Sequence, residues 1–530
     1  MPKSYSREKP SGHFDCIIIG SGLSGSGLAA MLSKAGKRCL VLERHYTAGG
    51  FTHVFKRRDY EWDVGVHYIG DVTREHSMLA RMFDYVTDGQ LKWADLGEVY
   101  DRIYFGDKAY DFVKGTENFR ARMKDYFPAP ADQRAIDEYL TLIRQAQQGS
   151  RELFMSKALP GFVTRLAGNY LTRKAQPFLR RTTREVMSEI TGNQELIGVL
   201  TGQYGDYGLP PGQSSFFMHA LLARHYLNGG AYPVGGSARI FDTIEPLINQ
   251  AGGEVYIRAE VKNIIVEKDR AVGVRMADGM EIRAPRVISS TGVHHTYGRL
   301  LSGVQKVAET TSQVETIAPS AAHLCLYIGF QHTAAELELP KTNYWIYPDN
   351  YDHDANLARF LANPDAPFPL VYASFPAAKD PEFEQRLPGR STIELITLGD
   401  YDRFRYWEDT LWKHRGGDYE ALKEQISQRL LKTLYHYLPQ LEGKVDYYEL
   451  STPLTTRHFV NYAHGEIYGL NHDPARFASK ALSVHTPVKN LYLTGQDIVS
   501  AGLGGALSAA MLTASVILRN NMYNEIMKSS

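Results

Sequence analysis

The sequence predicts an α/β protein, in which a domain built on a parallel sheet is assembled from separated segments and an α+β domain is inserted between them. Two observations lead to this fold class. The chain opens with a strand, a glycine-rich turn, a helix and a second strand, and similar patterns return near residues 230 and 485. With 530 residues the chain is also too long for one ordinary core, so two intertwined domains are expected.

The first segment, DCIIIGSGLSGSGLAAMLSKAGKRCLVLER (15–44), has the layout of a Rossmann-type dinucleotide-binding unit. The β-branched run 16–19 predicts a buried strand, and Gly20, Gly22 and Gly25 follow it as G-x-G-x-x-G. These glycines allow a tight turn, the approach of a pyrophosphate and close helix–strand packing, in that order. Glu43 ends the second strand, about twenty residues past the glycines, where a carboxylate can accept hydrogen bonds from a ribose.

The later segments complete this domain. A helix over 238–250 stops at a glycine pair, a strand (254–257) follows, and further strands surround the ADGME turn and end at Gly292. The tail from Lys489 is again strand, turn and helix. We therefore assign residues 12–75, 230–300 and 485–525 to the nucleotide-binding domain. Residues 76–229, whose pattern is mostly helical, and 301–484 form the substrate-binding domain.

Composition limits the partners and the compartment. The 59 basic and 59 acidic residues cancel, which removes a global attraction to nucleic acid. Three cysteines cannot form a disulfide framework, and the polar N-terminus has no apolar core of a secretory signal, so a cytoplasmic location is expected. His219 and His225 have no cysteine or carboxylate set beside them, so no metal site is predicted.

The single dinucleotide motif indicates which cofactor is bound. An enzyme holding a flavin and a nicotinamide in separate Rossmann domains needs two such motifs, so one motif favours one tightly held redox group. In LYLTGQD, Asp497 stands at a strand end where it can bind the ribityl or pyrophosphate region of FAD. The next helix offers N–H groups to the ring, and its dipole would stabilise negative charge on a reduced flavin.

Five stretches carry a family resemblance over nearly the whole chain. They are the opening motif, WDVGVHYIGD, YGDYGLPPGQSSFFMHALLARHYLNGGAYPVGGS, EIYGLNHDP and TPVKNLYLTGQDIVSAGLGGALSAAML. Together they resemble the retinol saturase branch of the phytoene desaturase and carotenoid isomerase flavoproteins. The resemblance implies FAD, a lipophilic polyene substrate and redox chemistry at a carbon–carbon double bond. Members of the group desaturate, isomerise or saturate, and these stretches favour saturation.

The motifs and the resemblance together define a set of candidate cofactor residues. These are Gly20, Ser21, Gly22, Leu23, Ser24, Gly25, Glu43, Arg44, Gly49, Gly50, Val261 (through its backbone), Gly292, Gly495, Asp497 and Leu503.

The candidate catalytic residues are His67 and Tyr68, which the family layout would place near the flavin ring. His67 could supply the proton that complements a hydride, or it could only hydrogen-bond backbone in a packed turn. Tyr204, Asp206 and Tyr207 are candidates for the substrate mouth, and the alternative is a capped turn.

Two segments bear on membranes. Residues 153–184 contain no acid and interleave basic with apolar side chains, which is typical either of an interfacial segment or of a solvated helix pair with a basic face. Residues 498–518 carry no charge, but their Gly, Ser and Ala content favours a buried helix over a membrane span.

Two classes of function remain. The first is a flavoenzyme acting on a hydrophobic C=C bond, with an amine-oxidase-like flavoprotein as the alternative enzyme. The second is a non-catalytic lipid-binding protein on the same scaffold, and the intact glycines, Glu43 and Asp497 favour the enzyme. A saturase must receive two electrons for each bond reduced, so an external electron donor is expected.

Overall fold

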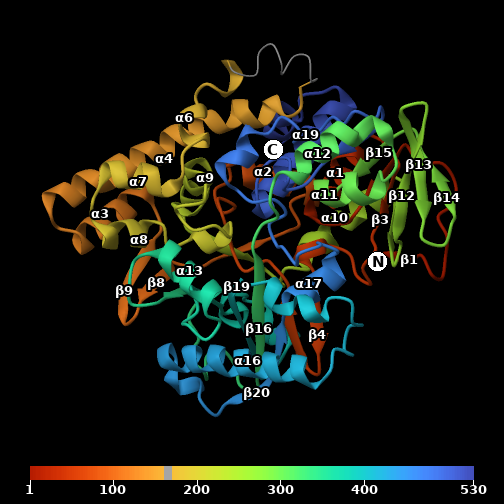
Figure 1. The fold of residues 1–530 in the computed structure, drawn as a ribbon. Coiled ribbons are helices and arrows are strands. Elements are labelled where there is room, and N and C mark those ends of the chain that lie inside the picture. The colour runs from red at the N-terminus through yellow and green to blue at the C-terminus, as the bar shows by residue number, and fades with distance from the viewer. Residues whose placement is uncertain (160–169, 530) are drawn as a thin grey trace.

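A six-stranded parallel sheet organises the fold in the computed structural model, which describes residues 1–159 and 170–529 (Figure 1). Its strands, in spatial order, are β1 (Lys3–Ser4), β11 (Glu254–Ile257), β3 (Cys39–Leu42), β2 (Cys16–Ile19), β15 (Val287–Ser289) and β21 (Leu491–Leu493). The strands come from the three segments that the sequence assigned to the nucleotide-binding domain, except β1, which adds the N-terminus to the edge.

Both faces of this sheet are covered, which is why its strands are apolar on both sides. Every residue of β2 and β3 is buried. One face packs against helices α1 (Leu23–Lys34), α10 (Arg239–Gln250) and α19 (Gly502–Leu518). The other face packs against a smaller antiparallel sheet and helices α11 (Val293–His295) and α12 (Ala308–Glu315). That sheet consists of β12 (Val261–Glu267), β13 (Arg270–Met276) and β14 (Glu281–Arg283).

A seven-stranded mixed sheet forms the second layer system, below the first in Figure 1. Its order is β20 (Val445–Ser451), β16 (Ala322–Phe330), β19 (Ser391–Gly399), β18 (Val371–Ser374), β17 (Asn343–Tyr347), β8 (Val99–Phe105) and β9 (Lys108–Val113). All neighbouring pairs are antiparallel except β17 and β8.

The two faces of this mixed sheet differ in chemistry. One face carries Leu326, Ile328 and Leu395 into an apolar core with helix α16 (Gly417–Tyr437). The strand registers place polar side chains together on the opposite face, and all of them are buried: Asp101, His323, Asn343, Tyr372, Ser374 and Glu394. From this face, His323 and Ile396 line the cavity described below, and the other polar side chains are not part of its lining.

A helical lobe occupies the left of Figure 1. Its elements are α3 (Thr116–Tyr126), α4 (Pro130–Ser156), α6 (Gln176–Leu179), α7 (Thr183–Ile190), α8 (Gln194–Leu200), η2 (Tyr204–Asp206) and α9 (Phe216–Tyr226). Their aromatic and aliphatic side chains share a core with β8, β9 and β17.

The remaining elements connect these units. The strands are β4 (Val54–Arg57), β5 (Tyr60–Asp63), β6 (Ile69–Gly70), β7 (Trp93–Asp95) and β10 (Gly230–Pro233). The helices are α2 (Met78–Thr87), α13 (His353–Ala362), α14 (Pro376–Lys379), α15 (Phe383–Arg386), α17 (Pro453–Val460), α18 (Pro474–Ala478) and α20 (Met522–Lys528). The short turns are η1 (Gly50–Thr52), η3 (Thr296–Leu300), η4 (Gln305–Val307), η5 (Asp402–Trp407) and η6 (Pro439–Leu441).

The structure adds detail to two predictions, the helical character of residues 76–229 and the buried helix in the uncharged stretch 498–518. Residues 76–229 are mostly helical, but β7, β8 and β9 interrupt them, and the β8–β9 hairpin joins the mixed sheet. Residues 502–518 of the uncharged stretch 498–518 form α19, which packs along α1. Among the described residues no single helix meets the length and hydropathy expected of a membrane span; α19 and α20 meet them only as a pair bent by 111°.

Candidate functional site

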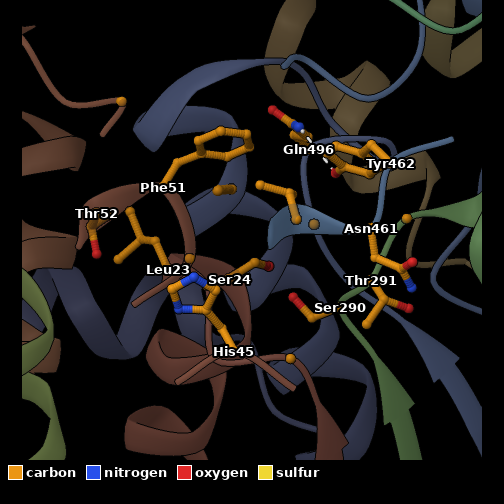
Figure 2. A pocket seen from close by; sticks show the side chains of 18 of the residues that line it. Leu23, Ser24, His45, Phe51, Thr52, Ser290, Thr291, Asn461, Tyr462 and Gln496 are labelled. Carbon is orange, nitrogen blue, oxygen red and sulfur yellow. Dashed lines mark hydrogen bonds between the residues drawn. The ribbon is translucent and has the colours of Figure 1, made fainter. Parts of the chain in front are cut away.

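The candidate site is a cavity between the carboxyl ends of the parallel strands and the polar face of the mixed sheet. Figure 2 shows side chains from distant segments around it: Leu23 and Ser24 at the start of α1, Phe51 and Thr52 in η1, and Asn461 and Tyr462 after α17. Cavities at the carboxyl edge of an open parallel sheet are the usual ligand sites of such folds.

The glycine turn enters this cavity as the sequence predicts. Gly20 has a φ of +97° and turns the chain out of β2. A Cβ built on Gly25 would lie 2.1 Å from the carbonyl oxygen of Gly20, so this position needs glycine for α1 to pack on the strand. A Cβ built on Gly22 meets no atom of the described residues within 4 Å, because Gly22 faces the cavity. The third glycine therefore has a structural role, and the second leaves room for a ligand.

Glu43 braces this turn from inside. Its Oε2 accepts hydrogen bonds from the backbone N–H of Ser21 (2.9 Å) and from Ser21 Oγ (2.7 Å), and its Oε1 accepts one from the N–H of His45 (2.8 Å). The N–H of Gly49 donates to Ser21 Oγ at 3.0 Å. The carboxylate also lines the cavity, so its contact with a ribose stays a prediction beside this observed bracing role.

Asp497 ties three segments together at the opposite end. Its Oδ2 accepts from the N–H of Val293 at 2.8 Å and its Oδ1 from the N–H of Leu470 at 3.1 Å. Behind it the buried guanidinium of Arg476 donates to the carbonyl oxygens of Leu470 (2.8 Å) and Gln496 (2.6 Å). Asp497 lines the cavity, and its contact with the ribityl or pyrophosphate region stays a prediction.

Twelve of the fifteen predicted cofactor residues line this one cavity; Ser21, Gly25 and Gly49 stand directly behind its wall. Arg44 lines it while donating to the carbonyl oxygens of His458 (2.7 Å) and Phe459 (2.8 Å). The sequence reasoning missed several further lining residues: His45, Phe51, Ser290, Asn461, Tyr462, Gln496, His323 and Ile396. His45, Phe51, Ser290 and Gln496 lie within two residues of predicted cofactor residues, whereas His323 and Ile396 lie far from every motif.

His67 lines the cavity, but its environment does not suit a proton donor. Its Nδ1 is buried without a hydrogen-bond partner among the described residues. Burial, with the nearby charge of Lys379, lowers the pKa of His67 to about 3. The ring is therefore neutral at neutral pH, whereas the predicted general acid requires the charged imidazolium.

Tyr68 does not line the cavity, so its predicted place near the flavin ring has no support from the lining. It is buried, and its hydroxyl donates to Asp101 Oδ2 at 2.9 Å and lies 3.2 Å from Asp206 Oδ2. Burial raises the pKa of Asp101 to about 6, and burial with the neighbouring charge of Asp101 raises that of Asp206 to about 8. Asp206 therefore holds a proton at neutral pH, and Tyr68 connects the two carboxyl groups.

Tyr204 and Tyr207 are fully buried and do not line this cavity, so nothing in its geometry supports their predicted place at the substrate mouth. Residues 204–206 make the short helix η2, which has no side-chain cap hydrogen bond, and Tyr207 Oη lies 3.2 Å from His219 Nδ1. Tyr139 Oη lies 2.9 Å from His219 Nε2, so both ring nitrogens of that histidine are used in the core.

A buried lysine that the sequence reasoning did not identify supports the His67 segment. Lys379 Nζ donates to the carbonyl oxygen of His67 (3.1 Å), to Ser374 Oγ (2.9 Å) and to Asn343 Oδ1. Burial lowers the pKa of Lys379 to about 8. Its three N–H groups are all used by these acceptors, so it fixes the backbone of His67 without facing the cavity.

Stability should depend on pH through Asp206. Because the fold raises its pKa, the folded protein binds a proton that the unfolded chain has lost between about pH 4 and pH 8. Asp206 therefore favours the folded state at low pH, and this contribution declines as the pH rises through the folded pKa. A tenfold difference in proton affinity between the folded and unfolded chain corresponds to about 1.4 kcal/mol of stability.

Asp206→Asn removes this titration and leaves an acceptor for Tyr68. The urea midpoint of the variant should therefore rise relative to the unsubstituted protein between pH 5 and pH 8. A difference between the two proteins that stays constant over this range would contradict the raised pKa.

Comparison with known proteins identifies the family. The model of the family "Flavin containing amine oxidoreductase" matches residues 21–518. All-trans-retinol 13,14-reductase of Danio rerio is 36% identical over 96% of this chain and 87% of its own length. A second protein of that species, described as an inactive all-trans-retinol 13,14-reductase, is 31% identical over 99% of this chain and 89% of its own. Prolycopene isomerase of Arabidopsis thaliana is 25% identical over 95% and 83%.

Solved structures agree on the fold. Putrescine oxidase bound to putrescine aligns over 96% of this chain and 100% of its own with a TM-score of 0.61, although only 14% of residues are identical. The match confirms the α/β fold class. The glycine turn, the cavity at the sheet edge and the full-length relatives all agree: the chain belongs to the flavin-containing amine oxidoreductase family, in the retinol saturase branch of its carotenoid isomerases and desaturases.

Proposed function

We propose that this chain is an FAD-dependent oxidoreductase that saturates one carbon–carbon double bond of a lipophilic polyene alcohol such as all-trans-retinol. The glycine turn 20–25 and Glu43 together form what we call the dinucleotide cradle. The observation that carries the proposal is that this cradle is intact in a chain whose relatives at 36% identity are retinol reductases. The match to the isomerase is weaker, at 25% identity, which favours saturation over isomerisation. Because one relative is described as inactive, the cradle matters more to the proposal than membership of the family.

The residues present fit FAD. Cβ atoms built on Gly22, Gly495 and Gly502 meet no atom of the described chain within 4 Å, and all three residues line the cavity, so the backbone is bare where a cofactor would approach. The N-termini of α1 and α19 both reach the cavity and offer N–H groups and positive dipole ends to a pyrophosphate and to a reduced ring. Glu43, Arg44 and Val261 would hold the adenosine end, and Leu503 and His67 would flank the ring.

FAD supplies the hydride when it is bound and reduced. The chain's own residues supply a largely apolar cavity and a neutral His67 whose backbone is fixed by Lys379. We assign the accompanying proton to water, since His67 is neutral and Tyr68 stands outside the cavity. The sequence has one dinucleotide motif, so the two electrons are proposed to come from a separate reductase.

We also propose that the basic segment contacts anionic lipid, from which a polyene would enter. Tyr170 is 65% exposed, and the guanidinium of Arg173 lies 4.2 Å from the centre of its ring. Lys174 and Arg180 are exposed as well, although Lys174 pairs with Glu152 at 3.3 Å. Residues 160–169 of this segment lie outside the described residues.

Flavin binding should depend on Gly22. Gly22→Val fills space that the protein leaves open, so the variant should fold but be purified without flavin absorbance. Gly192→Val is the matched control: that glycine also has no described neighbour within 4 Å, but it is exposed and outside the cavity, so flavin should be retained. A yellow Gly22→Val protein would show that the cofactor lies elsewhere.

Reaction direction should be visible without oxygen. The holoenzyme, reduced chemically, should recover its oxidised absorbance when all-trans-retinol is added, as a hydride and a proton add across one double bond. Stopped-flow absorbance measures reoxidation of the flavin, and mass analysis of the product measures the two hydrogens gained by the polyene. If retinol and other polyenes leave the reduced enzyme unchanged while a more saturated lipid bleaches the oxidised enzyme, the protein is a desaturase.

Vesicle binding should depend on the exposed basic side chains. Changing Arg173, Lys174 and Arg180 to Glu should reduce cosedimentation with anionic vesicles, because each cation near such a surface contributes about 1 kcal/mol. Flavin absorbance should not change. Equal sedimentation of the variant and the unsubstituted protein would leave the solvated helix pair as the correct interpretation.

A further inference from the structure

Two histidines stand at the end of the cavity next to the mixed sheet. His323 comes from β16 and His67 from the loop after β5, and both line the cavity. Their neighbours in the lining at this end are Val66, Ile396 and Ile467. The two imidazoles are therefore set among apolar side chains, and Tyr468, which follows Ile467, is a further polar residue of the lining.

Neither imidazole has a hydrogen-bond partner in the described part of the chain. Among the described residues five histidines are buried. Four of them hydrogen-bond through a ring nitrogen: His53, His219, His353 and His472. His323 is the exception, since its ring makes no hydrogen bond to any described residue, and its Nδ1 is buried. The Nδ1 of His67 is unpaired in the same way. Buried polar groups without partners are costly, so each needs an explanation, and beside a cavity a bound ligand is one such explanation.

The pair is suited to a neutral ligand group. Burial lowers the pKa of His67 to about 3 and that of His323 to about 4, so each ring offers one donor and one acceptor at neutral pH. No free cation faces this end among the described lining residues: Arg44 is engaged with the 458–459 backbone, and Lys379 uses its three N–H groups elsewhere. A carboxylate would lack a counter-charge here, whereas a hydroxyl can donate to one ring and accept from the other.

We infer that His67 and His323 bind the hydroxyl group of the substrate and thereby select a polyene alcohol over the corresponding hydrocarbon. This inference rests on the proposed function. It agrees with the bond named in the relatives, since in retinol the carbon that carries the hydroxyl is bonded to C14 of the 13,14 double bond. A hydroxyl site must therefore lie beside the reacting bond, and the cavity end near His67 is where the proposed ring of the cofactor would be.

Equilibrium binding to the oxidised holoenzyme tests the inference without turnover. Two ligands are compared: all-trans-retinol, and the hydrocarbon in which hydrogen replaces its hydroxyl. The unsubstituted protein should bind the alcohol at least about tenfold more tightly, because the hydrocarbon leaves two buried imidazoles unpaired. His323→Leu should lower affinity for the alcohol and not for the hydrocarbon, so the ratio should fall toward one.

Two further variants separate recognition from structure. His323→Gln keeps a donor and an acceptor and should restore part of the preference. His436→Leu, on the exposed surface of α16, should leave both affinities unchanged. Flavin absorbance of every variant verifies that the cradle is intact.

The inference fails if His323→Leu weakens both ligands equally or neither. Failure of the proposed function looks different: the unsubstituted holoenzyme would bind the alcohol selectively and still reduce no polyene. The two outcomes are therefore distinguishable.

Discussion

The close packing of α1 on β2 is the contact on which the site depends. It brings the backbone of Gly25 so near the carbonyl of Gly20 that no side chain fits between them. This approach fixes the axis of α1, and the axis determines where its free N–H groups point. The Ser21–Glu43 hydrogen bonds then hold the turn, and Gly50 packs against Gly22, where a Cβ would come within 2.8 Å of its Cα. The glycine turn is thus open on the side that faces the cavity and is supported on its other side by contacts with neighbouring backbone.

The mixed sheet shows a second constraint, which concerns polar burial. Asp101, Glu394 and Lys379 are buried and cannot all be charged without cost. Burial raises the pKa of both carboxyl groups, and the lysine donates to three oxygen acceptors. Such a network fixes the His67 segment in one position. Much of the polar chemistry near the cavity therefore has a positioning role, which explains why Tyr68 and Asp206 resemble functional residues in the sequence and yet lie behind the wall.

The parts of the site that follow from local chain geometry could be predicted from the sequence. The strand, glycine turn, helix and acid of residues 15–44 are contiguous, and twelve of the fifteen predicted cofactor residues do line one cavity. His323 and Lys379 could not be found, because their place depends on how β16 and α14 pack against the His67 segment, which is far from both in the chain. The β8–β9 hairpin was missed since its alternation is short and lies inside a mostly helical region. The sequence left two places open for Tyr204 and Tyr207, because glycine-flanked aromatic residues also occur in packed turns, and both side chains are buried in the core.

The two-residue strand β1 has a consequence for how the folded chain meets its neighbours in a crowded solution. Without it, β11 would be the outer strand of an apolar parallel sheet, with its N–H and C=O groups open to pairing with another molecule. Lys3 and Ser4 occupy that edge, Lys3 forms ion pairs with Glu8 and Glu254, and Tyr5 packs edge-on against Tyr256. A short, charged edge is a poor template for intermolecular strand addition. Residues 3–5 thus cover the edge of the sheet that carries the cofactor turn, and this coverage disfavours aggregation by strand pairing.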